Sequence, residues 1–167
     1  MADYVTVEAF EAIAKGLEAA KVRFMVVGGL AMQAHGLDRI TYDVDLVIQL
    51  EPANVIRAFE ALESAGYRPA VPIVAAQFAD PPTRESFRRD KGMTVLNFWS
   101  SRFPETKLDI FVAEPFDFDS EYAQALRNSV AGMELRFPRV ETLLAMKRLA
   151  HRQKDLNDIV FLETLLR

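Results

Sequence analysis

The chain has 167 residues, of which 50% are hydrophobic and 26% are charged, and these values exclude a disordered, collagen-like or coiled-coil protein. It contains no cysteine and only two histidines, which excludes disulfide bonds, thiolate metal sites and cysteine nucleophiles and disfavours a polyhistidine metal site. The formal net charge of −4 supplies no global positive field that would attract nucleic acid.

Length and hydropathy predict a single cytoplasmic domain over residues 1–167. No segment reaches the roughly 18 apolar residues that a membrane span requires, and the first residues lack the basic and apolar regions of a secretory signal. No repeat, low-complexity tract or long linker divides the chain.

The first third of the chain alternates between helical and strand-like patterns. Apolar residues at helical spacing begin it, and a short apolar run that ends in Gly28-Gly29 predicts a buried strand entering a tight turn. Pro52 is typical of a helix start and Gly66 of a helix end. The predicted elements are helices over 5–21, 30–35 and 52–65 and strands over 23–28 and 43–50.

The rest of the chain carries both weak and strong patterns. Pro69 and Pro72 restrict a strand over 67–76 to a sheet edge, and the polar stretch 77–92 predicts a loop with a helical turn or two. The stronger patterns predict strands over 93–99 and 107–113, a strand or ribbon over 129–137, and helices over about 138–150 and 155–166. Together they indicate an α/β (α+β) fold with a mixed β-sheet flanked by helices, with a core over about 23–113 and a C-terminal helical part over about 138–167.

Three aspartates interrupt the apolar strands. Asp43 and Asp45 lie two residues apart and therefore project from the same face of one strand, and Asp109 interrupts another. Two carboxylates about 4 Å apart repel by about 4 kcal/mol at an effective dielectric constant near 20, a cost that a divalent cation removes. Oxygen donors suit Mg²⁺ or Mn²⁺. If the two strands are neighbours, the three acids could bind paired metals for phosphoryl transfer, with Asp109 as the base.

The Gly28-Gly29 pair adds an expected anion site. Glycines let backbone N–H groups approach a phosphate, and the short helix that follows would add its N-terminal dipole. A glycine pair alone is usually a turn, and an Asp-x-Asp pattern arises by chance in a chain with 24 acidic residues. Their conjunction with Asp109 indicates a site for a nucleoside triphosphate and its metal.

These motifs resemble those of the DNA polymerase β-like nucleotidyltransferase superfamily. The residues that carry the resemblance are Val27-Gly28-Gly29-Leu30-Ala31, Arg39-x-Thr41-x-Asp43-x-Asp45 and Leu108-Asp109-Ile110. Within the superfamily, the chain is most similar to small bacterial nucleotidyltransferases related to the toxin of type IV abortive-infection toxin–antitoxin systems. Their late block of a Lys, an Arg and an Asp-x-x-Asp matches Lys147, Arg152, Asp155 and Asp158. The resemblance runs from about residue 23 to the C-terminus.

The resemblance implies metal-dependent transfer of a nucleoside monophosphate from an NTP, with pyrophosphate as the leaving group. Asp43 and Asp45 would bind both metals, and Asp109 would complete the second metal site and act as the base. The nucleotide-binding residues would be Gly28, Gly29, Arg39, Thr41 and Lys147. Many relatives have Ser at the position of Gly29, and the related toxins are longer and carry a large C-terminal domain. For Lys147 a solvated helix face, and for Asp155 a helix cap, are the structural alternatives.

The acceptor and the biological role stay open at this point. The acceptor could be tRNA, a protein hydroxyl or a small molecule such as an aminoglycoside-like antibiotic, and a toxin role would imply an antitoxin partner. The negative net charge suits a cationic drug, whereas a basic group near the expected acceptor side, formed by Arg84, Arg88, Arg89 and Lys91, suits a phosphate-bearing acceptor. A catalytically silent nucleotide-binding or partner-binding module is the alternative from a different functional class.

Overall fold

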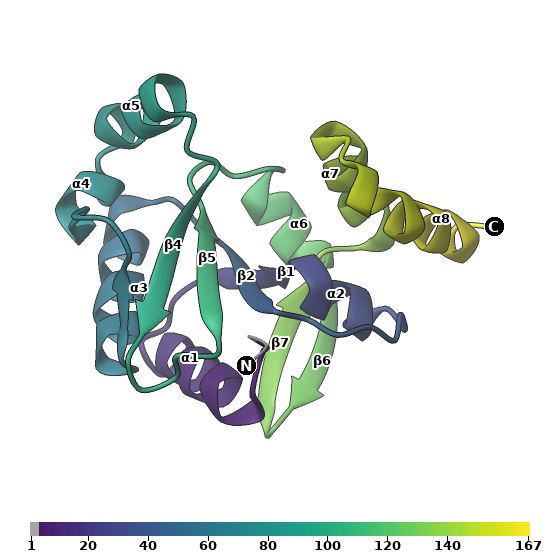
Figure 1. Cartoon of the computed structure of the whole chain (residues 1–167), viewed down its shortest axis with the longest axis horizontal. Coiled ribbons are helices and arrows are strands. Elements are labelled where there is room, and N and C mark those ends of the chain that lie inside the picture. The colour runs from purple at the N-terminus through teal and green to yellow at the C-terminus, as the bar shows by residue number, and fades with distance from the viewer. Residues whose placement is uncertain (1–3) are drawn as a thin grey trace.

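A mixed five-stranded sheet forms the centre of the protein, whose computed structural model describes residues 4–167 (Figure 1). The strands are β1 (Phe24–Val27), β2 (Asp43–Ile48), β3 (Tyr67–Pro69), β4 (Val95–Ser100) and β5 (Lys107–Phe111). Their order is β1-β2-β5-β4-β3. β2 and β5 are parallel, and the other neighbours are antiparallel. The predicted mixed sheet is therefore confirmed, and the two acid-bearing strands are neighbours.

Helices flank the sheet, and a separate hairpin lies beside it (Figure 1). The helices are α1 (Val7–Ala19), α2 (Gly28–Ala34), α3 (Pro52–Ser64), α4 (Ala75–Ala79), α5 (Pro81–Lys91), α6 (Phe118–Gln124), α7 (Val140–Ala150) and α8 (Leu156–Leu165), the last preceded by a 3₁₀ turn over Gln153–Asp155. The hairpin consists of β6 (Leu126–Val130) and β7 (Met133–Phe137). Along residues 4–167, no helix is both long and apolar enough to cross a bilayer.

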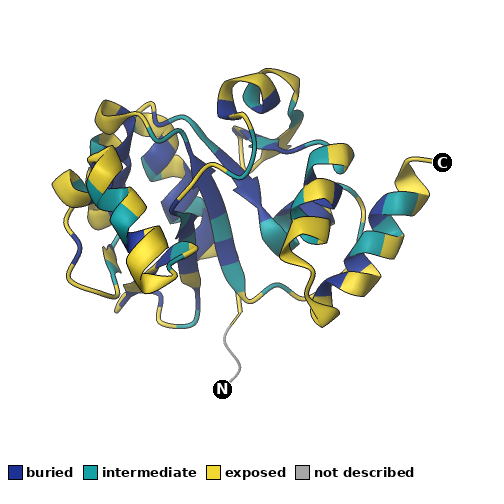
Figure 2. Ribbon diagram, turned by 90° about the horizontal axis from the view of Figure 1, so that it is seen from above, coloured by how far each residue is buried: buried dark blue, intermediate teal, exposed yellow. Residues whose placement is uncertain are grey.

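The two faces of the sheet differ in how completely they are covered. One face carries Val44, Leu46 and Ile48 of β2 and packs with α1 and α3 into the main core. On the other face, Val47 joins Phe118 of α6 in a small second cluster. Figure 2 shows buried residues concentrated in the strands and exposed residues on the outer sides of the helices. Because α6 covers only part of the second face, the beginning of β2 and β5 remains accessible there.

The polar stretch 77–92 is mostly helical, so the prediction of a loop with only a helical turn or two was wrong. The Asp80 side chain accepts a hydrogen bond from the Thr83 N–H and caps α5, which has proline in its first turn. Gly92 ends α5 in a left-handed conformation, with φ 62°. α5 has no apolar stripe, because Phe87 is its one buried residue. The local start and stop signals therefore account for the helix.

The segment between β5 and α7 also differs from the prediction. The short helix α6 was not predicted, and Asp117 caps it by accepting a hydrogen bond from the Ser120 N–H. The expected strand or ribbon over 129–137 is a complete hairpin that begins earlier, at Leu126. Its turn is formed by Ala131 and Gly132, which both have positive φ, as two-residue hairpin turns require.

Candidate active site

The predicted acids lie together on the open part of the second sheet face. In the parallel pairing of β2 with β5, Asp45 lies opposite Asp109, and Asp43 lies opposite Lys107. On its other side Asp45 pairs with Val27, the last residue before Gly28. The structure therefore brings the Asp-x-Asp motif, the third acid and the glycine pair to one position of the sheet.

Mutual repulsion and burial act strongly on these carboxyl groups. Burial and the charges of Asp109 and Asp43 together raise the pKa of Asp45 to about 7. The positive charges of Lys147 and Arg152 lower that pKa and so oppose the shift. Burial also raises the pKa of Asp109. The repulsion expected from the sequence is therefore present between side chains of two adjacent strands.

Asn97 of β4 holds the third acid and was not predicted as a site residue. Its Nδ2 donates a hydrogen bond of 2.5 Å to Oδ1 of Asp109, and this bond lowers the pKa of Asp109 against the effect of burial. Asn97 lies directly opposite Asp109 in the antiparallel pairing of β4 with β5. The polar residue at an alternate position of an apolar strand was the signal in the sequence. Trp99, two residues further on this face of β4, is 51% exposed.

The glycine pair is required by close packing within the site. Gly28 has φ +66°, and a Cβ atom there would collide with the Asp45 carboxylate. A Cβ atom on Gly29 would lie 2.8 Å from Oγ1 of Thr41. α2 includes both glycines and so begins two residues earlier than predicted. Thr41 thus fills the space that a side chain at position 29 would need.

The predicted cations are held by buried carboxylates. Arg39 Nη1 donates to both carboxylate oxygens of Asp158, at 2.8 and 2.7 Å. Lys147 Nζ lies 3.1 Å from Oδ1 of Asp155 and 3.0 Å from Oδ2 of Asp158. Arg152 also pairs with Asp155, at 2.7 Å. Burial raises the pKa of Asp155, but the hydrogen bonds and the positive charges of Arg152 and Lys147 together lower it by more.

These pairs correct two structural interpretations made from the sequence. The Lys147 side chain is only 14% exposed, so it does not lie on a solvated helix face. Asp155 precedes α8, but its side chain makes no capping hydrogen bond. Its carboxylate is instead 1% exposed and paired with two cations. Both residues therefore belong to an ion-pair network beside the site.

The donor set suits a hard divalent cation, although no complete metal site is preformed. Within the described residues, no group of three or more His, Cys, Asp or Glu side chains is arranged to hold a metal ion. The three aspartates offer only oxygen atoms, which Mg²⁺ and Mn²⁺ prefer. Burial, and then repulsion by Asp109 and Asp43, raises the pKa of Asp45, and such a cation would relieve the repulsion.

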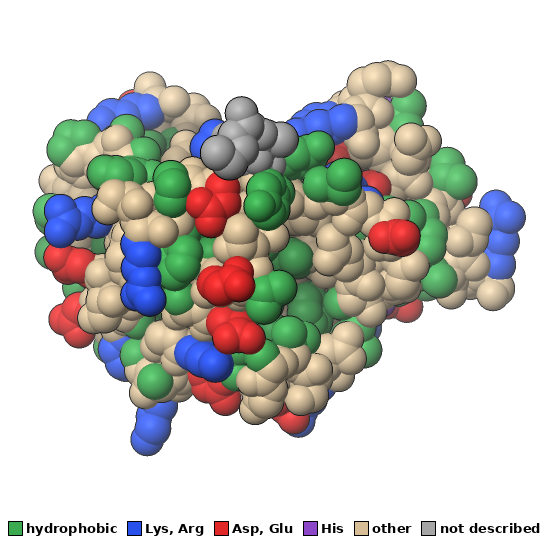
Figure 3. All heavy atoms as spheres, turned by 60° about the horizontal axis from the view of Figure 1, so that its bottom comes forward, with side chains coloured by type: hydrophobic (Ala, Val, Ile, Leu, Met, Phe, Trp, Pro, Cys, Tyr) green, Lys and Arg blue, Asp and Glu red, His purple; other side chains and the backbone are tan. Residues whose placement is uncertain are grey.

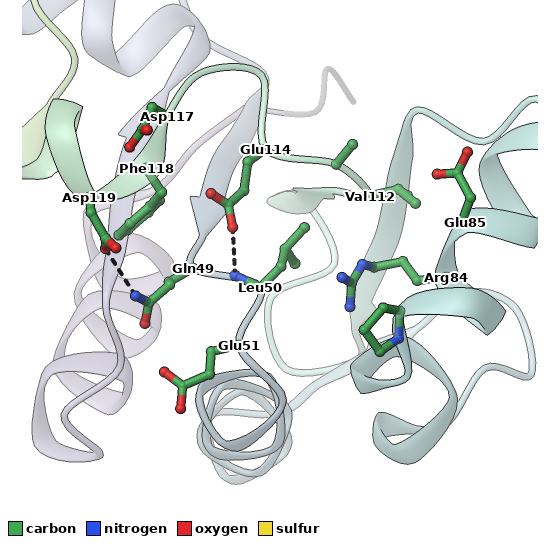
Figure 4. A pocket seen from close by; sticks show the side chains of 12 residues that line it. Gln49, Leu50, Glu51, Arg84, Glu85, Val112, Glu114, Asp117, Phe118 and Asp119 are labelled. Atoms are coloured by element: carbon green, nitrogen blue, oxygen red, sulfur yellow. Dashed lines mark hydrogen bonds between the residues drawn. The ribbon is translucent and has the colours of Figure 1, made fainter.

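The basic residues of 84–91 lie away from these acids. They belong to α5, where Arg88 pairs with Glu85 at 2.6 Å and Arg89 pairs with Asp90 at 3.0 Å. Arg84 and Glu85 line a hollow of about 790 Å³ together with residues that follow the ends of β2 and β5 (Figure 4). Since Asp43 and Lys107 begin those strands, the structure does not bring the basic group to the predicted site.

A second hollow, of about 800 Å³, lies on the side where β2 begins. Its lining comes from α1, α2, the β6–β7 hairpin and the segment before β2, including Ile40, Thr41 and Tyr42. Most of the lining side chains are apolar, and Figure 3, which turns the lower side of Figure 1 forward, shows hydrophobic side chains with acidic ones between them on that side of the molecule. Space for a partly apolar ligand therefore exists beside Thr41.

The sheet, its helices and the parallel pair of acid-bearing strands form a nucleotidyltransferase fold, as solved structures show. The lincosamide antibiotic adenylyltransferase LnuA, bound to lincomycin, matches with a TM-score of 0.61 and 16% identity, over 96% of this chain and 98% of that chain. The antibiotic-resistance factor ANT(2'')-Ia matches with a TM-score of 0.60 and 15% identity, over 95% and 83%. An antigenic nucleotidyltransferase-like protein from Paracoccidioides brasiliensis matches with a TM-score of 0.54 and 21% identity, over 95% and 75%.

Comparisons of the sequence alone give no match. No family model matches the chain, and no curated protein does. At these low identities, the structural likeness establishes the fold alone. The expected fold of the nucleotidyltransferase superfamily is thereby confirmed.

Proposed function

We propose that the protein is a metal-dependent nucleotidyltransferase that moves a nucleoside monophosphate from an NTP, ATP being the first to test, to a hydroxyl group of a small molecule. The observation that carries this proposal is the register of β2 and β5. It puts Asp45 opposite Asp109 beside the Gly28 turn, on an open sheet face of a nucleotidyltransferase fold.

The residues divide into a phosphate-binding set and a metal-binding set. Gly28, Gly29 and Thr41 would lie along the triphosphate, and Arg39 and Lys147 would contribute positive charge to it. Asp43, Asp45 and Asp109 would hold Mg²⁺ or Mn²⁺, which neutralises charge on the carboxylates and the phosphates when bound.

Asp109 is the proposed general base. Its carboxylate would take the proton from the acceptor hydroxyl as that oxygen forms a bond to the α-phosphorus. The bond from the α-phosphorus to the bridging oxygen then breaks, and pyrophosphate leaves with the electron pair. Asn97 occupies one oxygen of Asp109 and leaves the other for the metal or the hydroxyl.

A small-molecule acceptor is favoured over a large RNA or protein. LnuA is a lincosamide antibiotic adenylyltransferase with lincomycin bound, and the likeness covers 98% of that chain. The net charge of −4 suits a cationic acceptor. The basic group on α5, which would have suited a phosphate-bearing acceptor, is distant from the acids and largely paired. A toxin that modifies tRNA or protein and has an antitoxin remains the competing role.

A transfer assay tests the proposal. Each of the four NTPs, radiolabelled at the α-phosphate, is incubated with Mg²⁺ and one acceptor class at a time: lincosamides, aminoglycosides, total tRNA or a bacterial protein extract. We expect label on a small molecule and stoichiometric pyrophosphate release, both abolished by EDTA and reduced at least about 10²-fold in Asp109→Asn. Label on tRNA or protein would favour the toxin role. NTP binding without pyrophosphate release would identify a silent module.

A further inference from the structure

Five charged side chains connect the C-terminal helices to the segment that precedes β2. They are Arg39, Lys147, Arg152, Asp155 and Asp158, called here the C-terminal charge network. Asp158 is its centre, because one carboxylate accepts hydrogen bonds from Arg39, 119 positions earlier in the chain, and pairs with Lys147 of α7. The network therefore joins two segments that no local sequence pattern connects.

The carboxylates of the network are buried, Lys147 is 14% exposed, and the two arginines are the exposed members. The side chains of Asp155 and Asp158 are 1% and 6% exposed, whereas those of Arg39 and Arg152 are 38% and 51% exposed. A buried carboxylate is costly unless cations pair with it. An anion arriving from solvent would meet the two arginines first, and it could not replace the carboxylates without opening the helices. A phosphate group would therefore bind to the cations in addition to the carboxylates and would not displace them.

The network keeps positive charge and donors beyond its internal pairs. It holds one more cation than carboxylate. Lys147 has three N–H donors, of which one donates to Oδ1 of Asp155, and its ammonium group also lies 3.0 Å from Oδ2 of Asp158. Gln33 Nε2 donates both to the backbone oxygen of Arg39 at 2.7 Å and to Oγ1 of Thr41 at 2.9 Å, so the network reaches the segment beside the glycine pair. The charges of Lys147 and Arg152 also act on Asp45. The surplus is available to a ligand with several negative charges.

We propose that Asp158 is a positioning residue that fixes Arg39 and Lys147 next to each other, so that one triphosphate contacts cations from the segment before β2 and from α7. This inference rests on the proposed function, since it takes the ligand to be a nucleoside triphosphate. Free Lys and Arg side chains lose rotamer entropy when they are ordered. Asp158 imposes that order before the ligand arrives, and preorganisation of this kind increases affinity.

Affinity for magnesium tripolyphosphate, measured by calorimetry, tests the inference. This probe carries the charge of the triphosphate without a base or a sugar, so base preference does not affect it. We expect Asp158→Asn to weaken its binding about tenfold, as loss of an outer-shell partner of a ligand-binding group does. Glu163→Gln is the matched control, because Glu163 of α8 pairs with Arg148 in an exposed ion pair at 3.2 Å. The control variant should bind like the wild type.

A double-mutant cycle separates positioning from a general structural role. If Asp158 acts through Arg39, Asp158→Asn should have a clearly smaller effect on tripolyphosphate affinity when Arg39 is already Gln. Steady-state kinetics should show an increased KM for the NTP with little change in kcat. Additive effects in the cycle, unchanged affinity or tighter binding in Asp158→Asn would each overturn the inference.

A second variant and the binding measured for the wild-type protein complete the test. If Asp158→Asn does not fold, Arg39→Lys replaces it, because this exposed change keeps the charge but removes the two-oxygen contact. It should weaken tripolyphosphate binding several-fold, and unchanged binding would overturn the inference. Failure of wild-type protein to bind magnesium tripolyphosphate or any NTP would count against the proposed function itself. Wild-type binding with no effect of either variant would count against the positioning role alone.

Discussion

At the scale of single residues, Asp45 is placed where it opposes folding. Its pKa is raised from 3.8 to about 7 by burial and by Asp109 and Asp43. Between these two values the folded state holds a proton that the unfolded chain has lost. The free energy of unfolding therefore falls as the pH rises from about 4 to 7, and stays at the lower level above that range.

The first prediction is that Asp45→Asn stabilises the metal-free protein at pH 8 while it removes activity. We expect a gain of about 1–3 kcal/mol, somewhat less than the full pKa shift would give. Urea unfolding in EDTA at pH 5 and pH 8 measures it, and the gain should be larger at pH 8. Asp38→Asn, which changes an exposed acid before β2, should show no such difference. A variant less stable than the wild type at pH 8 would contradict the electrostatic account.

The second prediction concerns the contact between Gly29 and Thr41. A Cβ atom on Gly29 would lie 2.8 Å from Oγ1 and 3.0 Å from Cγ2 of Thr41, so Gly29→Ala should lower stability by about 1–3 kcal/mol through overpacking. Thr41→Ala removes both atoms. The double variant should therefore be more stable than the sum of the two single effects predicts, as thermal unfolding of all four proteins would show. Strict additivity would mean that the residues do not compete for this space.

At the scale of elements, α5 shows how local signals can form a helix without an apolar stripe. The third prediction is that Asp80→Ala destabilises the protein by about 1 kcal/mol, because it removes the cap that accepts the Thr83 N–H. Asp90→Ala is the control, since Asp90 lies in the last turn and caps nothing. Chemical denaturation of both variants measures the difference, and equal effects would show that the cap does not hold α5.

The elements that the sequence predicted well are those with a strong hydrophobic period. β2 and β5 alternate around their aspartates, and α1 and α3 carry apolar stripes, so each was expected within a few residues of its observed bounds. α5 was missed because only Phe87 is buried in it, although Asp80, the prolines that follow and Gly92 were readable as start and stop signals. α6 is too short to show a period.

The candidate site was predictable only where its residues belong to a local sequence pattern. The motifs named its acids and glycines, and alternation predicted that Asp43 and Asp45 share a face. Asn97 could have been found as a polar residue in an apolar strand. The pairing of Arg39 with Asp158 spans 119 positions, and only the contact of α8 with the segment before β2 creates it. No local pattern contains that information.

At the scale of the whole molecule, two segments far apart in the sequence should respond to one ligand. The fourth prediction is that magnesium ATP slows amide hydrogen exchange in 28–45 and also in α7 and α8, since Arg39 and Lys147 would contact the same triphosphate. Hydrogen-exchange mass spectrometry measures both regions. Adenosine with Mg²⁺ is the control ligand and should protect neither region. Protection confined to 28–45 would separate the C-terminal helices from nucleotide binding.

The position of Trp99 has an optical consequence. The chain contains one tryptophan, and it is half exposed on the sheet face that carries Asn97, next to the acids. Emission excited on the red side of the tyrosine absorption band therefore comes from this face and from nowhere else in the molecule. The native protein carries its own fluorophore beside the site, and binding of an acceptor can be followed as quenching or a spectral shift without any label.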